Sequence, residues 1–276
     1  MNIAVLSGKG GTGKTTVSAC LVASLGQCQY IDCDVEEPNG YIFLHPNISN
    51  KYAVKVSVPQ VDQDRCDGCG MCSNACQFNA LAVVKGKVLL FPELCHHCGA
   101  CVIACTEEII SEVEREIGIV ETNDDYTFVH GRLNIGEPIS IPIIKELKRR
   151  IRDDIPTILD CSPGASCSVV QSIEGCDFCL LVTEPTPFGL HDLEIAVNLV
   201  RKMELSFGIV INKAGGDDSI IHQYCHREKI DILLEIPFSK KVAQSYSKGQ
   251  LPVFDNFGLR DDFYDMYNKI QGRVRK

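Results

Sequence analysis

The sequence predicts an α/β fold built on a mostly parallel, doubly wound sheet, with a small α+β module inserted into it. Apolar runs that end in aspartate or asparagine recur along the chain, separated by segments long enough for helices. The first of these runs, Asn2–Leu6, leads through a glycine-rich loop into an expected helix from Thr16 to about Leu25. Two similar runs of four cysteines between positions 66 and 105 interrupt this alternation and mark the insert.

The composition is that of a folded protein with an unusual number of cysteines. The chain has 276 residues, of which 45% are hydrophobic and 23% are charged, so a large buried core is expected. Its net charge of −9 argues against nucleic acid as a partner, and no apolar run approaches the roughly 18 residues of a membrane span. We expect a cytoplasmic protein without a signal peptide or membrane attachment, because the first apolar run is short and ends in glycines. In such a protein, sixteen cysteines indicate metal ligands rather than disulfides.

The loop after the first strand has the phosphate-binding pattern Gly8-x-x-x-x-Gly13-Lys14-Thr15. Its glycines allow backbone N–H groups to surround phosphate oxygens, and the following helix directs its positive end at the same anion. Lys14 is expected to reach the β- and γ-phosphates, and the Thr15 hydroxyl to ligate Mg²⁺. A glycine-rich turn before an ordinary helix is the alternative, but the complete pattern is more specific. The residues expected to bind the nucleotide are Gly8, Lys9, Gly10, Gly11, Thr12, Gly13, Lys14, Thr15 and Thr16.

A second lysine within this loop narrows the class of protein. The segment from Lys9 to Thr16 resembles the deviant Walker A motif of the MinD/Mrp/ParA family, SIMIBI-type P-loop ATPases that also include the nitrogenase iron protein. The resemblance implies an ATP-dependent homodimer in which Lys9 reaches the partner's nucleotide. It also implies slow, partner-stimulated ATP hydrolysis with Lys9, Lys14 and Asp34 as the catalytic residues. The alternative is a Lys9 side chain that is merely solvated.

Two aspartates close the next expected strand, which spans Gln29–Asp34. The carboxyl ends of strands in an α/β sheet face the ligand crevice, so Asp32 and Asp34 point at the phosphates if this strand neighbours the first. The family resemblance covers these positions. It implies that Asp34 orients the attacking water and that Asp32 has a Mg²⁺ or switch role. A pair of turn or cap aspartates is the alternative.

The cysteine runs repeat at a period of 29 residues and have the pattern of bacterial two-cluster ferredoxins, Cys-x-x-Cys-x-x-Cys-x-x-x-Cys. In that pattern, the first three cysteines of each run hold one [4Fe–4S] cluster and the fourth reaches the other. A hairpin around Lys85-Gly86, between the runs, also matches half of a ferredoxin. The expected ligands are Cys66, Cys69, Cys72 and Cys105 for cluster 1, and Cys95, Cys98, Cys101 and Cys76 for cluster 2.

This insert departs from the usual ferredoxin pattern in one respect. Gln77 and Thr106 replace the proline that usually follows the fourth cysteine, which loosens the turn but removes no ligand. Zinc is the alternative metal, although zinc sites favour paired Cys-x-x-Cys units over two complete runs of four. His96 and His97 lie within the second run, and we expect them to be solvated because the cysteines already complete the ligand count.

A later apolar run, Thr157–Asp160, ends in an aspartate and has the Walker B arrangement. Asp160 is therefore expected to hold Mg²⁺ through water. The Pro163-Gly164 loop that follows resembles the family's switch II, which senses the γ-phosphate. Cys161 and Cys167 lie on or beside this loop, where packing is the expected role and a redox or metal role stays open.

The remaining strands are expected to recognise the nucleotide base. The run Leu205–Asn212 ends at an asparagine, which the family uses to bind the adenine amino group, so Asn212 and Lys213 should select ATP over GTP. Pro237 ends the last expected strand, which begins at Ile232, and starts the loop that closes over the base.

For several other segments the sequence predicts structure but no function. Residues 111–139 alternate weakly and are expected to form a small hairpin joining the insert to the rest of the chain, followed by a helix at residues 141–151. Cys176 and Cys179 have the spacing of a metal pair, but Cys179 begins an expected core strand and should be buried. The role of His191 is not readable from the sequence. A C-terminal helix with Leu259, Phe263, Met266, Ile270 and Val274 on one face is expected to pack on the core rather than on a membrane.

The predicted organisation is an ATPase domain in two parts, residues 1–58 and 111–276, around an iron–sulfur insert at residues 59–110. The predicted function is an ATPase that uses ATP, Mg²⁺ and two [4Fe–4S] clusters. Its nucleotide-gated dimer would assemble or deliver metal clusters, or transfer electrons, to a recipient metalloprotein or iron–sulfur assembly protein. The alternative is a MinD-like positioning or scaffolding ATPase in which the clusters are structural or sensory.

Overall fold

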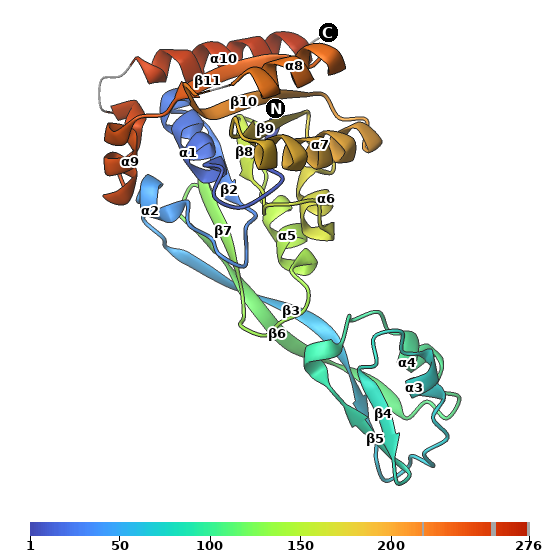
Figure 1. The fold of residues 1–276 in the computed structure, drawn as a ribbon. Coiled ribbons are helices and arrows are strands. Elements are labelled where there is room, and N and C mark those ends of the chain that lie inside the picture. Colours follow the sequence, from blue (N-terminus) through green and yellow to red (C-terminus); the bar gives the residue numbers. More distant parts are fainter. Residues whose placement is uncertain (217, 255–257, 275–276) are drawn as a thin grey trace.

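A nine-stranded sheet runs through the chain, whose computed structural model describes residues 1–216, 218–254 and 258–274 (Figure 1). In spatial order its strands are β11 (Ile232–Pro237), β10 (Phe207–Ala214), β9 (Phe178–Thr183), β1 (Asn2–Leu6), β8 (Thr157–Asp160), β2 (Gln29–Asp32), β7 (Phe128–Leu133), β6 (Ile110–Thr122) and β3 (Asn50–Val61). Every pairing from β11 to β7 is parallel, and the last two pairings are antiparallel. The mostly parallel α/β sheet predicted from the sequence is therefore confirmed.

Helices cover both faces of this sheet and enclose two apolar cores. One face carries α1 (Lys14–Leu25) and α10 (Leu259–Val274), with the short helices α2 (Tyr41–Leu44) and α9 (Lys240–Ser247) beside them. The other face carries α5 (Ile141–Lys148), α6 (Cys167–Ile173), α7 (Pro187–Lys202) and α8 (Ser219–Glu228). Because strands between β11 and β2 are buried on both faces, they are continuous apolar runs, as expected for a parallel sheet.

The C-terminal helix α10 packs on α1, as its apolar face predicts. Leu259, Phe263, Met266 and Ile270 are buried in the core between α1 and the sheet. Their burial confirms the expectation of a packed helix. Among the helices that the structure describes, none combines the length and apolar character needed to cross a membrane.

The strand order corrects one sequence-based expectation. β2 does not neighbour β1, because β8 is inserted between them. The three strands nevertheless end at the same edge of the sheet, and Asp32 at the end of β2 lies in register with Asp160 at the end of β8. The insertion of β8 therefore brings two carboxylates together beside the loop that follows β1.

Residues 111–139 form the hairpin expected from the sequence, because β6 and β7 pair in antiparallel fashion on either side of residues 123–127, but this hairpin is part of the main sheet. β6 pairs with β3 along its whole length and with β7 over Gly118–Thr122, and β7 pairs in parallel with β2. β3 and β6 thus extend the main sheet and then continue beyond it as a two-stranded ribbon, here called the ribbon (Figure 1). Ile117 is an extra residue in β6, because Val54 pairs with Gly118 and Lys55 with Glu116. This β-bulge lies where the ribbon leaves the sheet.

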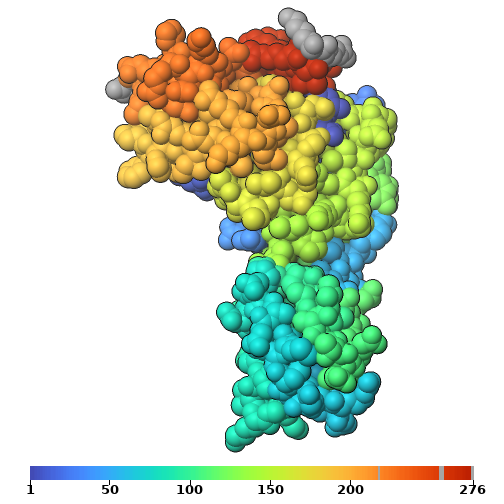
Figure 2. Space-filling view, turned by 90° about the vertical axis from the view of Figure 1, so that its right-hand side faces the viewer, coloured from blue at the N-terminus to red at the C-terminus, as the bar shows by residue number. Residues whose placement is uncertain are grey.

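Residues 62–109, here called the cysteine module, lie at the far end of the ribbon (Figures 1 and 2). They contain the hairpin of β4 (Leu81–Val84) and β5 (Lys87–Leu90), the helices α3 (Met71–Ala75) and α4 (Ala100–Ile103), and a short 3₁₀ turn at Pro92–Leu94. The hairpin predicted around Lys85-Gly86 is confirmed. A small core of its own, with Leu81, Val88 and Ile109, holds these elements together.

Gly118→Ala is expected to lower the free energy of unfolding by about 1–3 kcal/mol. A Cβ at this position would overlap the carbonyl oxygen of Arg132 and the side chain of Ile143. Urea unfolding measures the effect. Gly272→Ala is the matched control, because a Cβ there meets nothing within 4 Å outside the helix's own backbone. A Gly118→Ala protein as stable as the parent would show that the sheet yields at this point without cost.

Candidate nucleotide site and cysteine groups

The loop between β1 and α1 has a conformation that depends on glycine. Gly13 has φ 90°, and a Cβ there would overlap the side-chain amide of Asn212. A Cβ on Gly8 would overlap the backbone of Asp192 in α7. The N-terminus of α1 is therefore free to face a ligand held by the loop's backbone N–H groups. The hydroxyl of Thr12 is buried in this loop and has no hydrogen-bond partner among the described residues.

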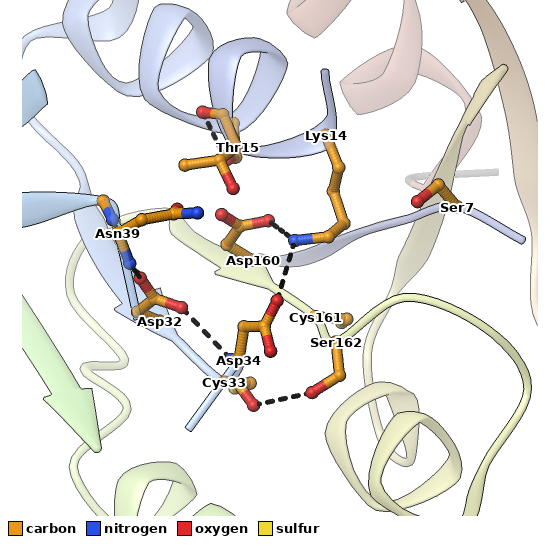
Figure 3. A network of polar contacts seen from close by, with 12 residues as sticks. Ser7, Lys14, Thr15, Asp32, Cys33, Asp34, Asn39, Asp160, Cys161 and Ser162 are labelled. Carbon is orange, nitrogen blue, oxygen red and sulfur yellow. Dashed lines mark hydrogen bonds and ion pairs between the residues drawn. The ribbon is translucent and has the colours of Figure 1, made fainter. Parts of the chain in front are cut away.

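Lys14 lies between two carboxylates at this edge of the sheet (Figure 3). Its Nζ donates to Asp160 Oδ1 at 2.6 Å and lies 3.9 Å from Asp34 Oδ2. Burial alone would lower the pKa of Lys14, but the neighbouring carboxylates, Asp160 above all, raise it overall. Burial raises the pKa of Asp34 to about 6 despite the charge of Lys14. The site thus concentrates acidic groups around one ammonium, as expected where a divalent cation and phosphates bind.

Asp32 holds the loop that follows β2. Its Oδ1 accepts from the backbone N–H of Asp34, and its Oδ2 accepts from Asn39 at 3.1 Å and Gly40 at 3.0 Å (Figure 3). Burial and then the charge of Asp160 raise the pKa of Asp32. Both carboxylate oxygens of Asp32 are thus engaged by the loop. The switch role and the role as a Mg²⁺ ligand both stay predictions.

Tyr30 is a site residue that the sequence reasoning missed. From β2 its hydroxyl donates to Asp160 Oδ2 at 2.9 Å, while Lys14 occupies Oδ1. The ring is buried and stacks on Phe128 with centroids 5.5 Å apart. A tyrosine inside an apolar strand gives no signal of this role, because the pairing depends on β8 lying next to β2.

The residues expected to select the base lie beside the phosphate-binding loop. Asn212 Nδ2 donates to the Thr12 carbonyl at 2.8 Å, and Lys213 Nζ donates to Gly11 O at 3.2 Å and pairs with Glu184 at 2.6 Å. The last strand, which ends at Pro237, pairs with the end of β10. Adenine recognition by these residues stays a prediction, since Asn212 here binds the loop itself.

Lys9 is half-buried within the loop and, among the described residues, forms no ion pair. The backbone around it is fixed: Ser7 Oγ donates to the Lys9 carbonyl at 2.7 Å, and the N–H of Gly164, in the switch II-like segment, donates to Ser7 O at 2.8 Å. A backbone hydrogen bond therefore joins the two loops.

The eight module cysteines line two separate pockets. One pocket is lined by Cys76, Cys95, Cys98 and Cys101, here called group 2. The other is lined by Cys66, Cys69, Cys72 and Cys105, here called group 1. The fourth cysteine of each run thus joins the first three of the other run, which is the grouping expected from the sequence pattern.

Among the residues the structure describes, no three His, Cys, Asp or Glu side chains converge on one metal position. His96 stacks on Phe78 and is exposed, as expected. The expectation that His97 is also solvated is wrong: both ring nitrogens are buried, and burial followed by the charge of Arg115 lowers its pKa.

Four of the cysteines outside the module belong to one of the two apolar cores. Cys33, Cys161, Cys176 and Cys179 are buried together, and burial raises the pKa of each thiol. Such thiols stay neutral and unreactive, which fits the packing role expected for Cys161 and the burial expected for Cys179. Cys167 and His191 are exposed, at the starts of α6 and α7.

Comparison with known families decides the class of protein. Residues 3–253, most of the chain, match the family described as the CobQ/CobB/MinD/ParA nucleotide binding domain. The chain belongs to this family. The resemblance predicted from Lys9 and its surrounding loop is thereby confirmed.

Individual relatives agree with membership in the CobQ/CobB/MinD/ParA family. The chain is 31% identical over 258 residues to an uncharacterised protein of Methanocaldococcus jannaschii, covering 91% of this chain and 90% of that one. It is 22% identical to a Pyrococcus horikoshii protein named iron-sulfur cluster carrier protein, covering 99% and 86%.

Solved structures show the same fold. The cell division ATPase MinD of Pyrococcus furiosus aligns over 98% of both chains with a TM-score of 0.59 and 18% identity. The septum site-determining protein MinD of Pyrococcus horikoshii, complexed with Mg-ADP, aligns over 98% of this chain and 95% of that one, with a TM-score of 0.60 and 16% identity. The main body therefore has the MinD-like P-loop fold.

Proposed function

We propose that this chain is an ATP-hydrolysing iron–sulfur protein whose nucleotide-dependent dimer assembles or delivers clusters, or transfers electrons, to a recipient metalloprotein or iron–sulfur assembly protein. The observation that carries the proposal is that the nucleotide loop and the two cysteine-lined pockets are connected within one chain. The sheet whose strand β1 leads into the MinD-like nucleotide loop continues, through the ribbon of β3 and β6, to two cysteine-lined pockets. The name of the Pyrococcus horikoshii relative, iron-sulfur cluster carrier protein, supports the same direction.

The residues around Lys14 fit MgATP. The Thr12 hydroxyl, buried without a partner, offers a donor where a phosphate oxygen would lie. Lys14 would leave Asp160 for the β- and γ-phosphates, and Thr15 with Asp160 would hold Mg²⁺, which neutralises charge on the transferring phosphoryl group. Tyr30 fixes the second oxygen of Asp160 and so orients the carboxylate. The Mg-ADP complex of the Pyrococcus horikoshii MinD supports this assignment.

Hydrolysis in this proposal needs a second protomer. Lys9, which has no ion pair among the described residues, would stabilise charge on the partner's phosphates. Asp34 would orient the attacking water, and its raised pKa suits a group that accepts a proton near neutral pH. Because Asp32 binds the backbone of Asp34, Asn39 and Gly40, closing of this loop on the phosphates would move the segment as one unit.

Asp34→Ala is expected to keep ATP binding while lowering hydrolysis by about 10²–10⁴-fold, so that the ATP-bound dimer accumulates. A fluorescent ATP analogue measures binding, phosphate release measures hydrolysis, and sedimentation measures the dimer. Glu37→Ala is the control, because Glu37 is exposed in the same loop. An Asp34→Ala protein that turns over ATP at the parental rate would contradict the role.

The donor sets of the two pockets fit [4Fe–4S] clusters. Each pocket offers four cysteines and little other polar lining, and cysteine thiolates are the ligands of such clusters. When bound, a cluster supplies one-electron chemistry. The chain's own contribution is to hold four sulfurs in each group, with Cys69 and Cys98 exposed and Cys72, Cys95 and Cys101 buried.

Anaerobic preparations are expected to contain iron and acid-labile sulfide at about eight each per chain, the content of two four-iron clusters. Colorimetric iron and sulfide assays, with electron paramagnetic resonance after reduction, measure this. Stoichiometric zinc without sulfide would overturn the cluster assignment and leave the nucleotide site unaffected.

A MinD-like positioning ATPase is the second candidate, favoured by the likeness to cell division ATPases. Sedimentation with anionic lipid vesicles, with and without ATP, distinguishes the two. ATP-dependent binding to vesicles would favour positioning. The apolar face of α10 already packs on α1, so it offers no apolar surface to a membrane.

A further inference from the structure

An ion pair connects the cysteine module to the main body. Arg115 of β6 donates both terminal nitrogens to the carboxylate of Glu137, which follows β7, with two contacts of 2.7 Å. The Glu137 side chain is 8% exposed and that of Arg115 is 27% exposed, so the carboxylate is buried and the guanidinium partly so. Arg115 Nη2 also lies 3.4 Å from the carbonyl of Pro92, just before Cys95. The pair therefore reaches from the main body to the loop that carries group 2.

Glu137 is joined in turn to the loop that contains Asp34 by a short series of backbone contacts. The carbonyl of Val35, next to Asp34, accepts from Leu133 N–H at 2.8 Å. The next residue, Asn134, donates to the carbonyl of Ile117 at 2.9 Å, and Glu137 N–H donates to the Asn134 carbonyl at 3.2 Å. Movement of the Asp34 loop would therefore act on the β-bulge and on Glu137 together.

The two cysteine groups stand at different distances from this connection. The group 2 pocket is lined by Ser57 and Pro59 of β3, whereas the group 1 pocket is lined by Val61 at the end of that strand. Ser57 and Pro59 precede Val61 along β3 by four and two residues. A strand rises about 3.3 Å per residue, so group 2 lies about 7–13 Å closer to the main body than group 1 does. Glu112 of β6, which also lines the group 2 pocket, gives the same order.

We propose that the Arg115–Glu137 pair couples the Asp34 loop to the segment 92–98, so that group 2 responds to nucleotide and group 1 does not. This rests on the proposed function, because it assigns different roles to its two clusters. Group 2 is the proximal, nucleotide-responsive site, and group 1 is the distal site.

The charges of Arg115 and Glu137 determine how such a response would change the midpoint potential of a cluster in group 2. Glu137 neutralises the guanidinium of Arg115 beside group 2. Reduction adds negative charge to a cluster, so an unneutralised arginine nearby favours the reduced state. Any loosening of the pair would raise the midpoint potential at group 2 and leave the more distant group 1 nearly unchanged. Arg115 and Glu137 act here as positioning residues that touch no reacting atom.

Glu137→Gln tests the proposal, because glutamine keeps the size of the side chain and removes its charge. Glu114→Gln is the matched control: Glu114 adjoins Arg115 on β6 and pairs with Lys55, but both are exposed. Redox titrations followed by electron paramagnetic resonance, with and without a non-hydrolysable ATP analogue, resolve the two potentials. We expect Glu137→Gln to raise one potential only and to abolish its response to the analogue. The control should behave like the parent.

Hydrogen exchange of the protein as purified anaerobically provides a readout that does not depend on cluster content. In the parent, the analogue should change protection at residues 92–98 more than at residues 62–70, and Glu137→Gln should remove the difference. Equal effects in both segments, or a nucleotide response that survives Glu137→Gln, would overturn the coupling. A protein without iron or sulfide would overturn the proposed function, while hydrogen exchange would still decide the connection itself.

Discussion

Replacing Lys9 with alanine is expected to abolish ATP-dependent dimerisation and to lower ATP hydrolysis by about 10³–10⁵-fold, the contribution of cationic groups supplied in trans to phosphoryl transfer. Lys9 differs from Lys14 in its surroundings. Lys14 is buried against Asp160, whereas Lys9 is half-buried and has no ion pair among the described residues. A lysine so placed is available to a partner's nucleotide. Sedimentation with ATP and phosphate release measure the two effects.

Two further variants make this test specific. Lys14→Ala should lose ATP binding altogether, whereas Lys9→Ala should bind ATP as a monomer. Lys51→Ala, on an exposed position of β3, controls for loss of one positive charge. A Lys9→Ala protein that dimerises and hydrolyses ATP like the parent would show that the lysine is only solvated, which was the alternative from the sequence.

Paired cysteine substitutions are expected to show which sulfurs share a cluster. Cys76→Ala combined with Cys95→Ala removes two residues of group 2, and should leave about four irons and four sulfides per chain. Cys76→Ala combined with Cys72→Ala removes one residue from each group, and should leave close to none. The two variants lose the same number of cysteines, so only the grouping distinguishes them.

Cys225→Ala is the control for these pairs, because Cys225 is buried in α8, far along the chain from the module. Its iron content should equal that of the parent. If Cys76→Ala with Cys72→Ala retained one full cluster and the group 2 pair retained none, each run would hold its own cluster, and the crossed grouping would be wrong.

The local parts of the fold could be predicted from the sequence. β1, the phosphate-binding loop and α1 follow from an apolar run, glycines and a Lys-Thr pair that are adjacent in the chain. The hairpin of the cysteine module follows from Lys85-Gly86 between apolar runs. These features depend on neighbours in sequence, which is why a pattern reveals them.

The parts that depend on distant segments could not be predicted. The insertion of β8 between β1 and β2, and with it the contact of Tyr30 with Asp160, is set by packing across about 130 residues of chain. β6 alternates weakly because its outer half lies in the ribbon, exposed on both faces, while its inner half is buried in the sheet. The contact of Arg115 with Glu137 also has no signal in the sequence, because it depends on how β6 packs against the segment that follows β7.

The ribbon also has a consequence for the evolution of this chain and for the order in which its parts fold. Val61 and Ile110, the residues on either side of the cysteine module, are a directly opposed pair at the end of an antiparallel ladder. A tight two-residue turn between them would close β3 and β6 into an ordinary hairpin. The main body can therefore gain or lose 48 residues at one point without any change in strand order, and the intervening segment can mature after the sheet has formed. The cysteine module is thus attached at the tip of a hairpin and is not part of the nucleotide-binding core.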